Sequence, residues 1–209
     1  MSHKLYKWEV ALVFGFLTAL LWGVTTARAQ GELAERVVRI HVIANSDSQE
    51  DQRLKLAVRD VVLQRVAEVG QGVDEPTELA RLLLSELARL EATAEHVLRE
   101  QSCGDEVTAE LSRCWFPTKH YGEFAFPAGE YTALRVVIGE GAGENWWCVA
   151  FPPLCVGAAA ESIEEAVTVG HFTQEQGDLL RMKDNGYVLR FKSMELLGAI
   201  KGMFLRGNT

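Results

Sequence analysis

The sequence predicts an α/β protein in which one mixed sheet of about four strands carries two long helices over one face. Three observations predict this α+β-like class. A β-branched segment at residues 36–44 is followed by two long amphipathic segments, at residues 49–69 and 76–101, and then by several short β-type segments. Each helix must bury its apolar stripe, so we expect the pair to form a layer over the sheet. A further strand and helix are predicted near the C-terminus.

The N-terminal residues have the three parts of a secretory signal. Two lysines precede residues 10–24, a run of 15 residues without a charge, and Ala27 and Ala29 then form an Ala-x-Ala cleavage site. A membrane-spanning helix needs about 20 apolar residues. We therefore predict a signal peptide over residues 1–29, and an uncleaved membrane anchor is the alternative. Both interpretations place the rest of the chain outside the cytoplasm.

Cleavage would leave an acidic chain. The full sequence has a net charge of −8, and losing the three basic residues and one acidic residue of the leader changes it to −10. A chain of this charge repels nucleic acid and anionic lipid, so we expect neither as a partner. The length fits a main α/β domain over residues 30–157, followed by a linker and a strand-helix extension over residues 158–209.

Residues 36–44 (RVVRIHVIA) predict a strand with one apolar face and one mixed face. The mixed face carries Val37, Arg39, His41 and Ile43. We interpret His41 as a sheet-face residue, because no other side chains lie at metal-ligand spacing from it. The sequence therefore predicts no metal site here.

The polar segment that follows is rich in side chains that start helices. Short oxygen-bearing side chains accept hydrogen bonds from the free amides of a first helical turn, and Ser48 with Asp51 resembles a capping box. A calcium site is the alternative, but the segment lacks the mid-loop glycine and the spacing of an EF-hand. We assign helix capping to five residues: Asn45, Ser46, Asp47, Ser48 and Asp51.

Alternating and β-branched segments predict strands at residues 106–115, 121–126, 131–138 and 147–151. The glycine-rich residues 139–145 separate the last two. A phosphate-binding loop would precede a helix, whereas this one carries two glutamates and precedes a strand. We therefore interpret it as a hairpin loop.

The C-terminal residues give weaker patterns. Residues 158–165 and 173–182 have helical character and read as the linker, residues 187–191 predict a short strand, and residues 193–205 predict a helix with an apolar side.

Four cysteines follow the leader and allow three pairings. The pairing of nearest neighbours joins Cys148 to Cys155 and Cys103 to Cys114. Two prolines keep the segment between Cys148 and Cys155 extended, and disulfides persist outside the cell. We predict a Cys148–Cys155 disulfide and leave the pairing of the other two cysteines open. Zinc is disfavoured, because the chain has no Cys-x-x-Cys motif.

The sequence carries no recognisable catalytic motif. It has no Gly-x-Ser-x-Gly elbow, no His-Glu-x-x-His pair and no papain-type cysteine signature. We therefore predict a protein without catalytic, cofactor-binding or metal-binding residues. An exported hydrolase is the alternative, and it would need a cleft that holds Glu123 with Glu130, or Cys114 with His120.

Two segments, at residues 116–122 and 145–155, have the character of a functional surface. Neighbouring residues of a strand point to opposite faces, so one of two adjacent tryptophans can point outward. An outward tryptophan beside a proline loop stiffened by a disulfide is typical of an interface anchor. The alternative is that both tryptophans pack under the helices. The candidate partner-binding residues are Trp146, Trp147, Phe151, Pro152, Pro153 and Leu154.

Several blocks of the chain resemble the stage II sporulation protein R family of endospore-forming bacteria. They are RIHVIANSDSQEDQ at residues 39–52 with LKLAVRD at 54–60, FPTKHYG at 116–122 with PAGEY at 127–131, and GEGAGENWWCVAFPPLC at 139–155. The last block is the most specific. Together they span most of the chain after the leader.

The resemblance implies an activating ligand that carries no catalytic residues. The forespore would make the protein and export it into the space between the two membranes of the septum. There it would trigger a membrane-embedded aspartyl protease of the mother-cell membrane, which trims the inactive precursor of sigma-E. The resemblance implies no nucleic-acid partner and no small-molecule cofactor.

Overall fold

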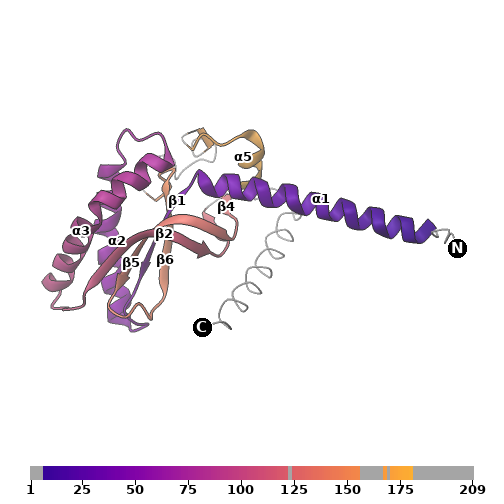
Figure 1. Ribbon diagram of the computed structural model, residues 1–209. Coiled ribbons are helices and arrows are strands. Elements are labelled where there is room, and N and C mark those ends of the chain that lie inside the picture. The colour runs from indigo at the N-terminus through magenta and orange to yellow at the C-terminus, as the bar shows by residue number, and fades with distance from the viewer. Residues whose placement is uncertain (1–6, 122–123, 156–166, 169, 181–209) are drawn as a thin grey trace.

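The computed structural model describes residues 7–121, 124–155, 167–168 and 170–180 (Figure 1). Two short strands, β3 and β4, form a small sheet of their own, and the other strands form the main sheet. The elements in chain order are α1 (Lys7–Glu35), β1 (Val38–Ile43), α2 (Gln49–Val69), α3 (Pro76–Glu100), β2 (Val107–Phe116), β3 (Lys119–Tyr121), β4 (Phe124–Phe126), β5 (Gly129–Ile138), β6 (Asn145–Phe151) and α5 (Gln174–Leu180).

The main sheet has four strands in the order β2-β5-β1-β6. Strand β1 runs parallel to β5 and antiparallel to β6, and β2 runs antiparallel to β5. The predicted fold class, a mixed sheet of four strands with helices packed against it, is confirmed.

Helices α2 and α3 cover one face of the sheet, as the sequence predicts (Figure 1). Val38, Ile40 and Val42 of β1 point into this core and pack with apolar residues of both helices, including Val58 and Leu83. Fully burying such a side chain stabilises the fold by about 1.5–3 kcal/mol. The alternating apolar positions of β1 and the helical stripes therefore fix this layer.

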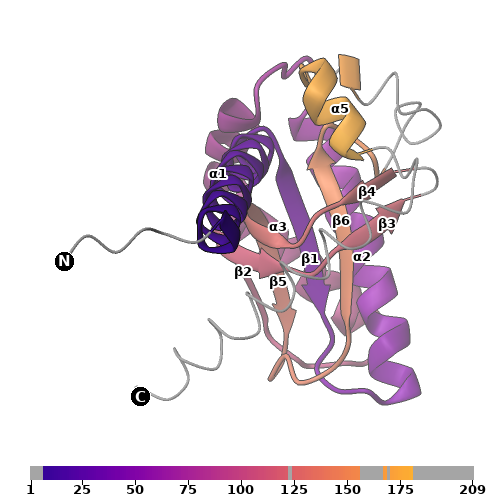
Figure 2. The same cartoon turned by 90° about the vertical axis from the view of Figure 1, so that its right-hand side faces the viewer.

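A second, smaller core covers the opposite face. Leu33 and Ala34 at the end of α1 pack with Phe116, Phe126 and Tyr131 from the strands. The β3–β4 hairpin and α5 lie on the same side (Figure 2). The sequence predicts helices over one face only, so this second layer is a result of the tertiary structure.

The glycine-rich loop is not a hairpin loop, and that prediction was wrong. Strand β6 pairs with β1, which lies between β5 and β6. The loop therefore crosses the end of β1. The predicted strand at residues 121–126 is instead the two-stranded β3–β4 hairpin. Helix α5 lies within the predicted helical segment 173–182, whereas the elements predicted at 158–165, 187–191 and 193–205 lie outside the described residues.

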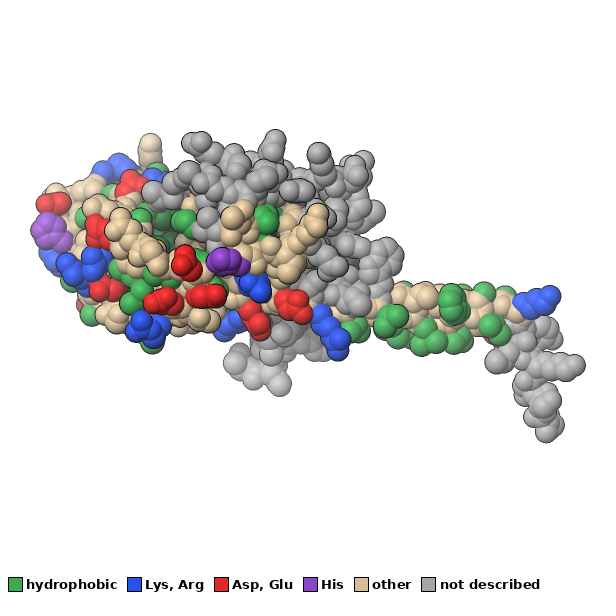
Figure 3. All heavy atoms as spheres, turned by 90° about the horizontal axis from the view of Figure 1, so that it is seen from above, with side chains coloured by type: hydrophobic (Ala, Val, Ile, Leu, Met, Phe, Trp, Pro, Cys, Tyr) green, Lys and Arg blue, Asp and Glu red, His purple; other side chains and the backbone are tan. Residues whose placement is uncertain are grey.

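Helix α1 projects from the body and is continuous from Lys7 to Glu35 (Figure 3). Its outer part presents large apolar side chains such as Phe14, Phe16 and Leu21 to solvent. The predicted cleavage site at Ala27 and Ala29 lies within this helix. Among the described residues, none of the helices reaches the length and apolar character that a membrane span requires.

Candidate functional site

The polar segment after β1 caps helix α2. Ser48 is the N-cap residue, and its Oγ accepts a hydrogen bond from the amide of Asp51 at 3.0 Å. Ser46 Oγ and Asn45 Nδ2 both donate to the Asp51 carboxylate. The hydrogen bond from Ser46 is the largest cause that holds the pKa of Asp51 below its usual value. The segment thus provides hydrogen-bond acceptors for free amides at the start of the helix. It also places negative charge at the positive end of the helix dipole, which is stabilising.

The same segment also forms hydrogen bonds with the glycine-rich loop. The hydrogen-bonded residues of the two motifs lie 95 and 97 residues apart in the sequence. Asn45 Oδ1 accepts from the amide of Glu140 at 3.0 Å, and Asp47 Oδ1 accepts from the amide of Glu144 at 2.7 Å. A Cβ atom at Gly143 would lie 2.3 Å from the carbonyl oxygen of Ser46. The two motifs are therefore one interlocked structural unit.

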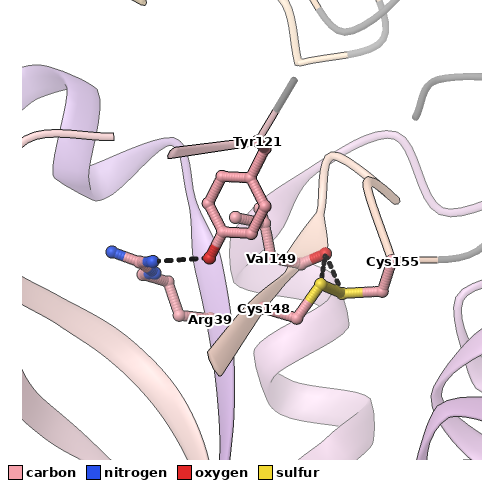
Figure 4. The surroundings of a disulfide bond; sticks show 5 residues. All are labelled: Arg39, Tyr121, Cys148, Val149 and Cys155. Atoms are coloured by element: carbon pink, nitrogen blue, oxygen red, sulfur yellow. Dashed lines mark hydrogen bonds between the residues drawn. A yellow bond between two sulfur atoms is a disulfide. The ribbon is translucent and has the colours of Figure 1, made fainter. Parts of the chain in front are cut away.

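A disulfide joins Cys148 in β6 to Cys155 after the strand, with a Cα–Cα distance of 6.0 Å (Figure 4). Cys155 Sγ lies 2.8 Å from the carbonyl oxygen of Val149. The loop closed by this bond contains the two prolines, and it is thereby held against the end of the strand.

Cys103 and Cys114 are free thiols. Cys103 packs against the core under α2 and α3, whereas Cys114 packs against the core on the other face. Strand β2 separates them, and about 23 Å lies between Val107 and Cys114 at the rise of an extended strand. A disulfide needs Cα atoms within about 7 Å, so these two cysteines cannot pair.

The two adjacent tryptophans lie on opposite faces of the sheet. Trp146 packs toward α2, where the guanidinium of Arg59 lies 5.4 Å from its ring centroid. Trp147 packs on the other face, stacked on His41 with ring centroids 4.9 Å apart. Both rings are half-buried. Each tryptophan therefore combines packing with partial exposure, and its role in partner binding stays a prediction.

The other candidate partner-binding residues differ in exposure. Phe151, Pro152 and Leu154 are buried, and Pro153 is exposed. Beside them lies an apolar pocket of about 250 Å³ between the end of α2 and the end of β6. Its walls include Leu63, Val66, Gly70, Phe151, Pro153 and Cys155. The disulfide loop therefore forms one side of a concave apolar surface at the last strand of the sheet.

The opposite face of β1 carries a row of side chains that crosses the whole sheet. The register aligns Glu110 of β2, Arg135 of β5, His41 of β1 and Trp147 of β6. Arg135 Nη1 pairs with Glu110 Oε1 at 3.1 Å. His41 is 5 % exposed, and neither of its ring nitrogens has a hydrogen-bond partner. Burial, followed by the charges of Arg135 and Arg39, lowers the pKa of His41 to about 4.

Arg39, next to this row, is completely buried. Its guanidinium lies 4.1 Å from the ring centroid of Phe116 and 4.9 Å from that of Tyr131. Nη2 donates to the hydroxyl of Tyr121 at 2.9 Å (Figure 4). Nε and Nη1 have no hydrogen-bond partner. The sequence places Arg39 on the mixed face of the strand but gives no sign of the aromatic rings around it, which come from distant segments.

The structure describes three of the four residues that a hydrolase would use: Glu130, Cys114 and His120. Glu130 is exposed on β5, and Glu123 lies outside the described residues. The thiol of Cys114 lies 3.3 Å from Ser112 Oγ, and His120 is exposed. No group of three or more His, Cys, Asp and Glu side chains with metal-binding geometry occurs within the described part of the chain.

Comparison with known proteins identifies the family. The family model of stage II sporulation protein R matches residues 34–161, which contain the whole main sheet and both covering helices. The chain belongs to the stage II sporulation protein R family. Membership in this family supports a role in sporulation.

Stage II sporulation protein R of Bacillus subtilis (strain 168) is 33% identical to this chain over 147 residues. The alignment covers 69% of this chain and 66% of the relative, slightly less than two thirds of that protein's length. No solved structure matches the chain. The resemblance to stage II sporulation protein R in the sequence blocks is thus confirmed.

Proposed function

We propose that this stage II sporulation protein R family member is an exported activator that binds a membrane-embedded aspartyl protease of the mother-cell septal membrane. In this proposal the protein acts in the space between forespore and mother cell and causes the protease to process the sigma-E precursor. It binds the protease and takes no chemical part in the cleavage.

Two features support export. The apolar outer part of α1, preceded by Lys4 and Lys7, has the composition of a secretory leader. The Cys148–Cys155 disulfide suits a compartment in which disulfides persist.

The observation that carries the binding proposal is the disulfide-closed loop at the end of β6. It presents Pro153 to solvent beside the apolar pocket, and the half-buried Trp146 and Trp147 lie in the same strand. Rigid apolar and aromatic anchors of this kind dominate binding energy at protein interfaces, because they lose little conformational entropy on binding. Strand β6 is also the last strand of the sheet, where an extended segment of a partner can pair.

The test is processing of the sigma-E precursor in cells that carry the candidate protease and produce the full-length chain. We expect cleavage with the unaltered protein and at least a tenfold loss with Trp146→Ala or Trp147→Ala, the size expected for an interface anchor worth about 2 kcal/mol. The matched control is Trp115→Ala, which removes a 44 % exposed tryptophan from β2 at the opposite edge of the sheet. Absence of processing by folded, oxidised and exported protein would overturn the proposal.

A further inference from the structure

The face of β1 opposite α2 and α3 contains a buried positive charge without an acidic neighbour. Arg39 is completely buried, and none of the residues that the structure describes forms an ion pair with it. On the same face of the sheet, the carboxylate of Glu110 binds Arg135. His41, two residues along the same strand, is neutral at neutral pH because its pKa is low.

Burial of an unpaired guanidinium is costly, because the charge loses its hydration and gains no carboxylate in return. The rings of Phe116 and Tyr131 offset part of this cost by cation–π attraction. The hydroxyl of Tyr121 satisfies one guanidinium nitrogen, but Nε and Nη1 stay unpartnered. A native protein rarely leaves buried donors in this state unless something else occupies them.

The surroundings suit an incoming anion. Lys119 is half-buried at the start of the β3–β4 hairpin, and its Nζ lies 5.3 Å from the ring centroid of Trp147. Burial and the nearby charge of Arg39 both lower the pKa of Lys119. An anion bound between Arg39 and Lys119 would relieve their mutual repulsion.

The element that closes the site is small. The β3–β4 hairpin has three residues in each strand, and its Tyr121 hydroxyl is the hydrogen-bond partner of Arg39. A two-stranded hairpin of this length has little stability of its own. Phe126 of β4 is nevertheless fully buried in the second core, so an anion that reaches Nη2 has to displace the half-buried Tyr121 at the end of β3.

From this geometry we propose that Arg39 of β1 and Lys119 at the start of the β3–β4 hairpin, beside Trp147, form a binding site for a carboxylate, and that its occupant is an acidic side chain of a protein partner. A carboxylate is planar and matches a guanidinium in hydrogen-bond geometry. The half-buried aromatic side chains of Tyr121 and Trp147 beside the site are typical of a protein interface. That this partner is the protease rests on the proposed function, whereas the carboxylate site does not.

The first test is the thermal unfolding of the full-length chain in sodium formate, compared with sodium chloride at equal ionic strength. A ligand that binds only the folded state raises its stability. We expect formate at ten times its Kd to raise the Tm by about 3–6 °C. The increase should vanish in Arg39→Met and shrink in Lys119→Met. Tyr121→Phe removes the hydroxyl that accepts from Arg39 Nη2, so this nitrogen also becomes available to formate. The increase in Tm should therefore remain in this variant.

A Tm that rises equally in formate and chloride, or a formate effect that persists unchanged in both Arg39→Met and Lys119→Met, would overturn the site. Arg39→Met changes a completely buried residue and can destabilise the fold, so Lys119→Met, at a half-buried position, is the second variant. Arg39→Lys, which keeps the charge and loses the fork of donors, should retain only part of the increase.

The second test concerns the partner. In the processing experiment, Lys119→Met should lower cleavage at least tenfold. The control is Lys55→Met, which removes the same charge from α2 on the opposite side of the sheet. A formate effect together with full processing by Lys119→Met would overturn the assignment to this partner. If the unaltered protein causes no processing, the proposed function fails, and the formate result still decides the carboxylate site.

Discussion

At the scale of single residues, strand β1 is unusual because it buries two polar side chains among apolar ones. All six of its residues are buried, and Arg39 and His41 share one face. The small residue Ala133 lies beside Arg39 in the register. Aromatic rings contact both residues: Phe116 lies against Arg39, and Trp147 stacks on His41. Polar groups buried in this way make stability sensitive to protonation and to ligands.

The first prediction concerns His41 and pH. Its pKa is about 4 in the folded protein and 6.5 in the unfolded chain. The unfolded chain therefore binds more protons between these values, so stability is lost as the pH falls from about 6.5 to about 4. We expect the loss from this residue to be at most about 3 kcal/mol. Urea unfolding at several pH values measures it.

The comparison variant for this experiment is His41→Phe, which keeps a ring against Trp147 and cannot be protonated. Its free energy of unfolding should change less over the same pH range. Carboxylates whose pKa values are lowered, such as Asp51, contribute equally to both proteins and cancel in the difference. Identical pH slopes for the two proteins would contradict the role of His41.

The second prediction concerns the cap of α2. Ser48→Ala removes the oxygen that accepts from the Asp51 amide, so we expect the free energy of unfolding to fall by about 1 kcal/mol. The control is Ser85→Ala in α3, where Ser85 Oγ only donates to the carbonyl of Leu82 within the helix. Alanine is a better helix former than serine, so this variant should be neutral or slightly stabilising. Equal losses in the two variants would exclude a capping role for Ser48.

At the scale of elements, the most informative feature is the contact between the start of α2 and the loop before β6. The loop amides of Ala142 and Gly143 donate to the carbonyls of Asn45 and Ala44. These bonds lie at the end of β1, where the loop crosses from β5 to β6. The polar residues at 45–51 therefore hold two connections at once, which explains why both the polar segment and the glycines are needed.

The third prediction tests this interlock. A Cβ at Gly143 would meet the backbone of Ser46, which no side-chain movement can relieve. We expect Gly143→Ala to destabilise the protein by about 1–3 kcal/mol, the usual cost of overpacking. Gly104→Ala is the control, because nothing lies within 4 Å of its Cβ position. Chemical denaturation measures the stability of both variants. An unchanged free energy of unfolding in Gly143→Ala would show that the loop does not depend on the close approach of Gly143 to the Ser46 backbone.

The two edge strands of the sheet, β2 and β6, differ in what covers them. On edge strand β2, the amide of Ala109 donates to Glu91 Oε1 at 2.8 Å, and that of Val107 donates to Glu95. Helix α3 thus occupies donors that would otherwise be open to pairing with another chain. Edge strand β6 carries the disulfide and the proline loop instead. The two edges are therefore built differently, which suits a binding role for β6.

At the scale of the whole molecule, the sheet has a large core on one face and a smaller aromatic core on the other. The end of α1 belongs to the second core, since Leu33 is completely buried there. Arg36 Nη1 also donates to the carbonyl oxygen of His171 at 3.0 Å. The first residues after the predicted cleavage site are therefore part of the folded body.

The fourth prediction follows from this arrangement. Leu33→Ala in the full-length chain should lower the free energy of unfolding by about 2–5 kcal/mol, because it leaves a cavity in the second core. Leu20→Ala changes the same residue type on the same helix, at a position that is 50 % exposed. It should have no measurable effect on unfolding. Similar values for the two variants would show that the end of α1 does not contribute to the fold.

The sequence by itself determined the fold class and, to within about two residues, the bounds of the four main strands and of both covering helices. Helix α2 has the predicted bounds, and α3 differs by one residue at its end. Ser48 and the short spacing of Cys148 and Cys155 are likewise local signals. All of these depend on residues close together in the chain, where side-chain periodicity and capping act directly on the backbone.

The tertiary structure alone decided the strand order and the surroundings of Arg39. Strand β1 lies between β5 and β6, although 94 residues of sequence separate its paired residues in β5 and 102 to 113 separate those in β6. The rings of Phe116, Phe126 and Tyr131 meet the Arg39 guanidinium only after these strands have paired. Local patterns give the faces of each strand but not its neighbours, because pairing depends on the burial of the whole sheet.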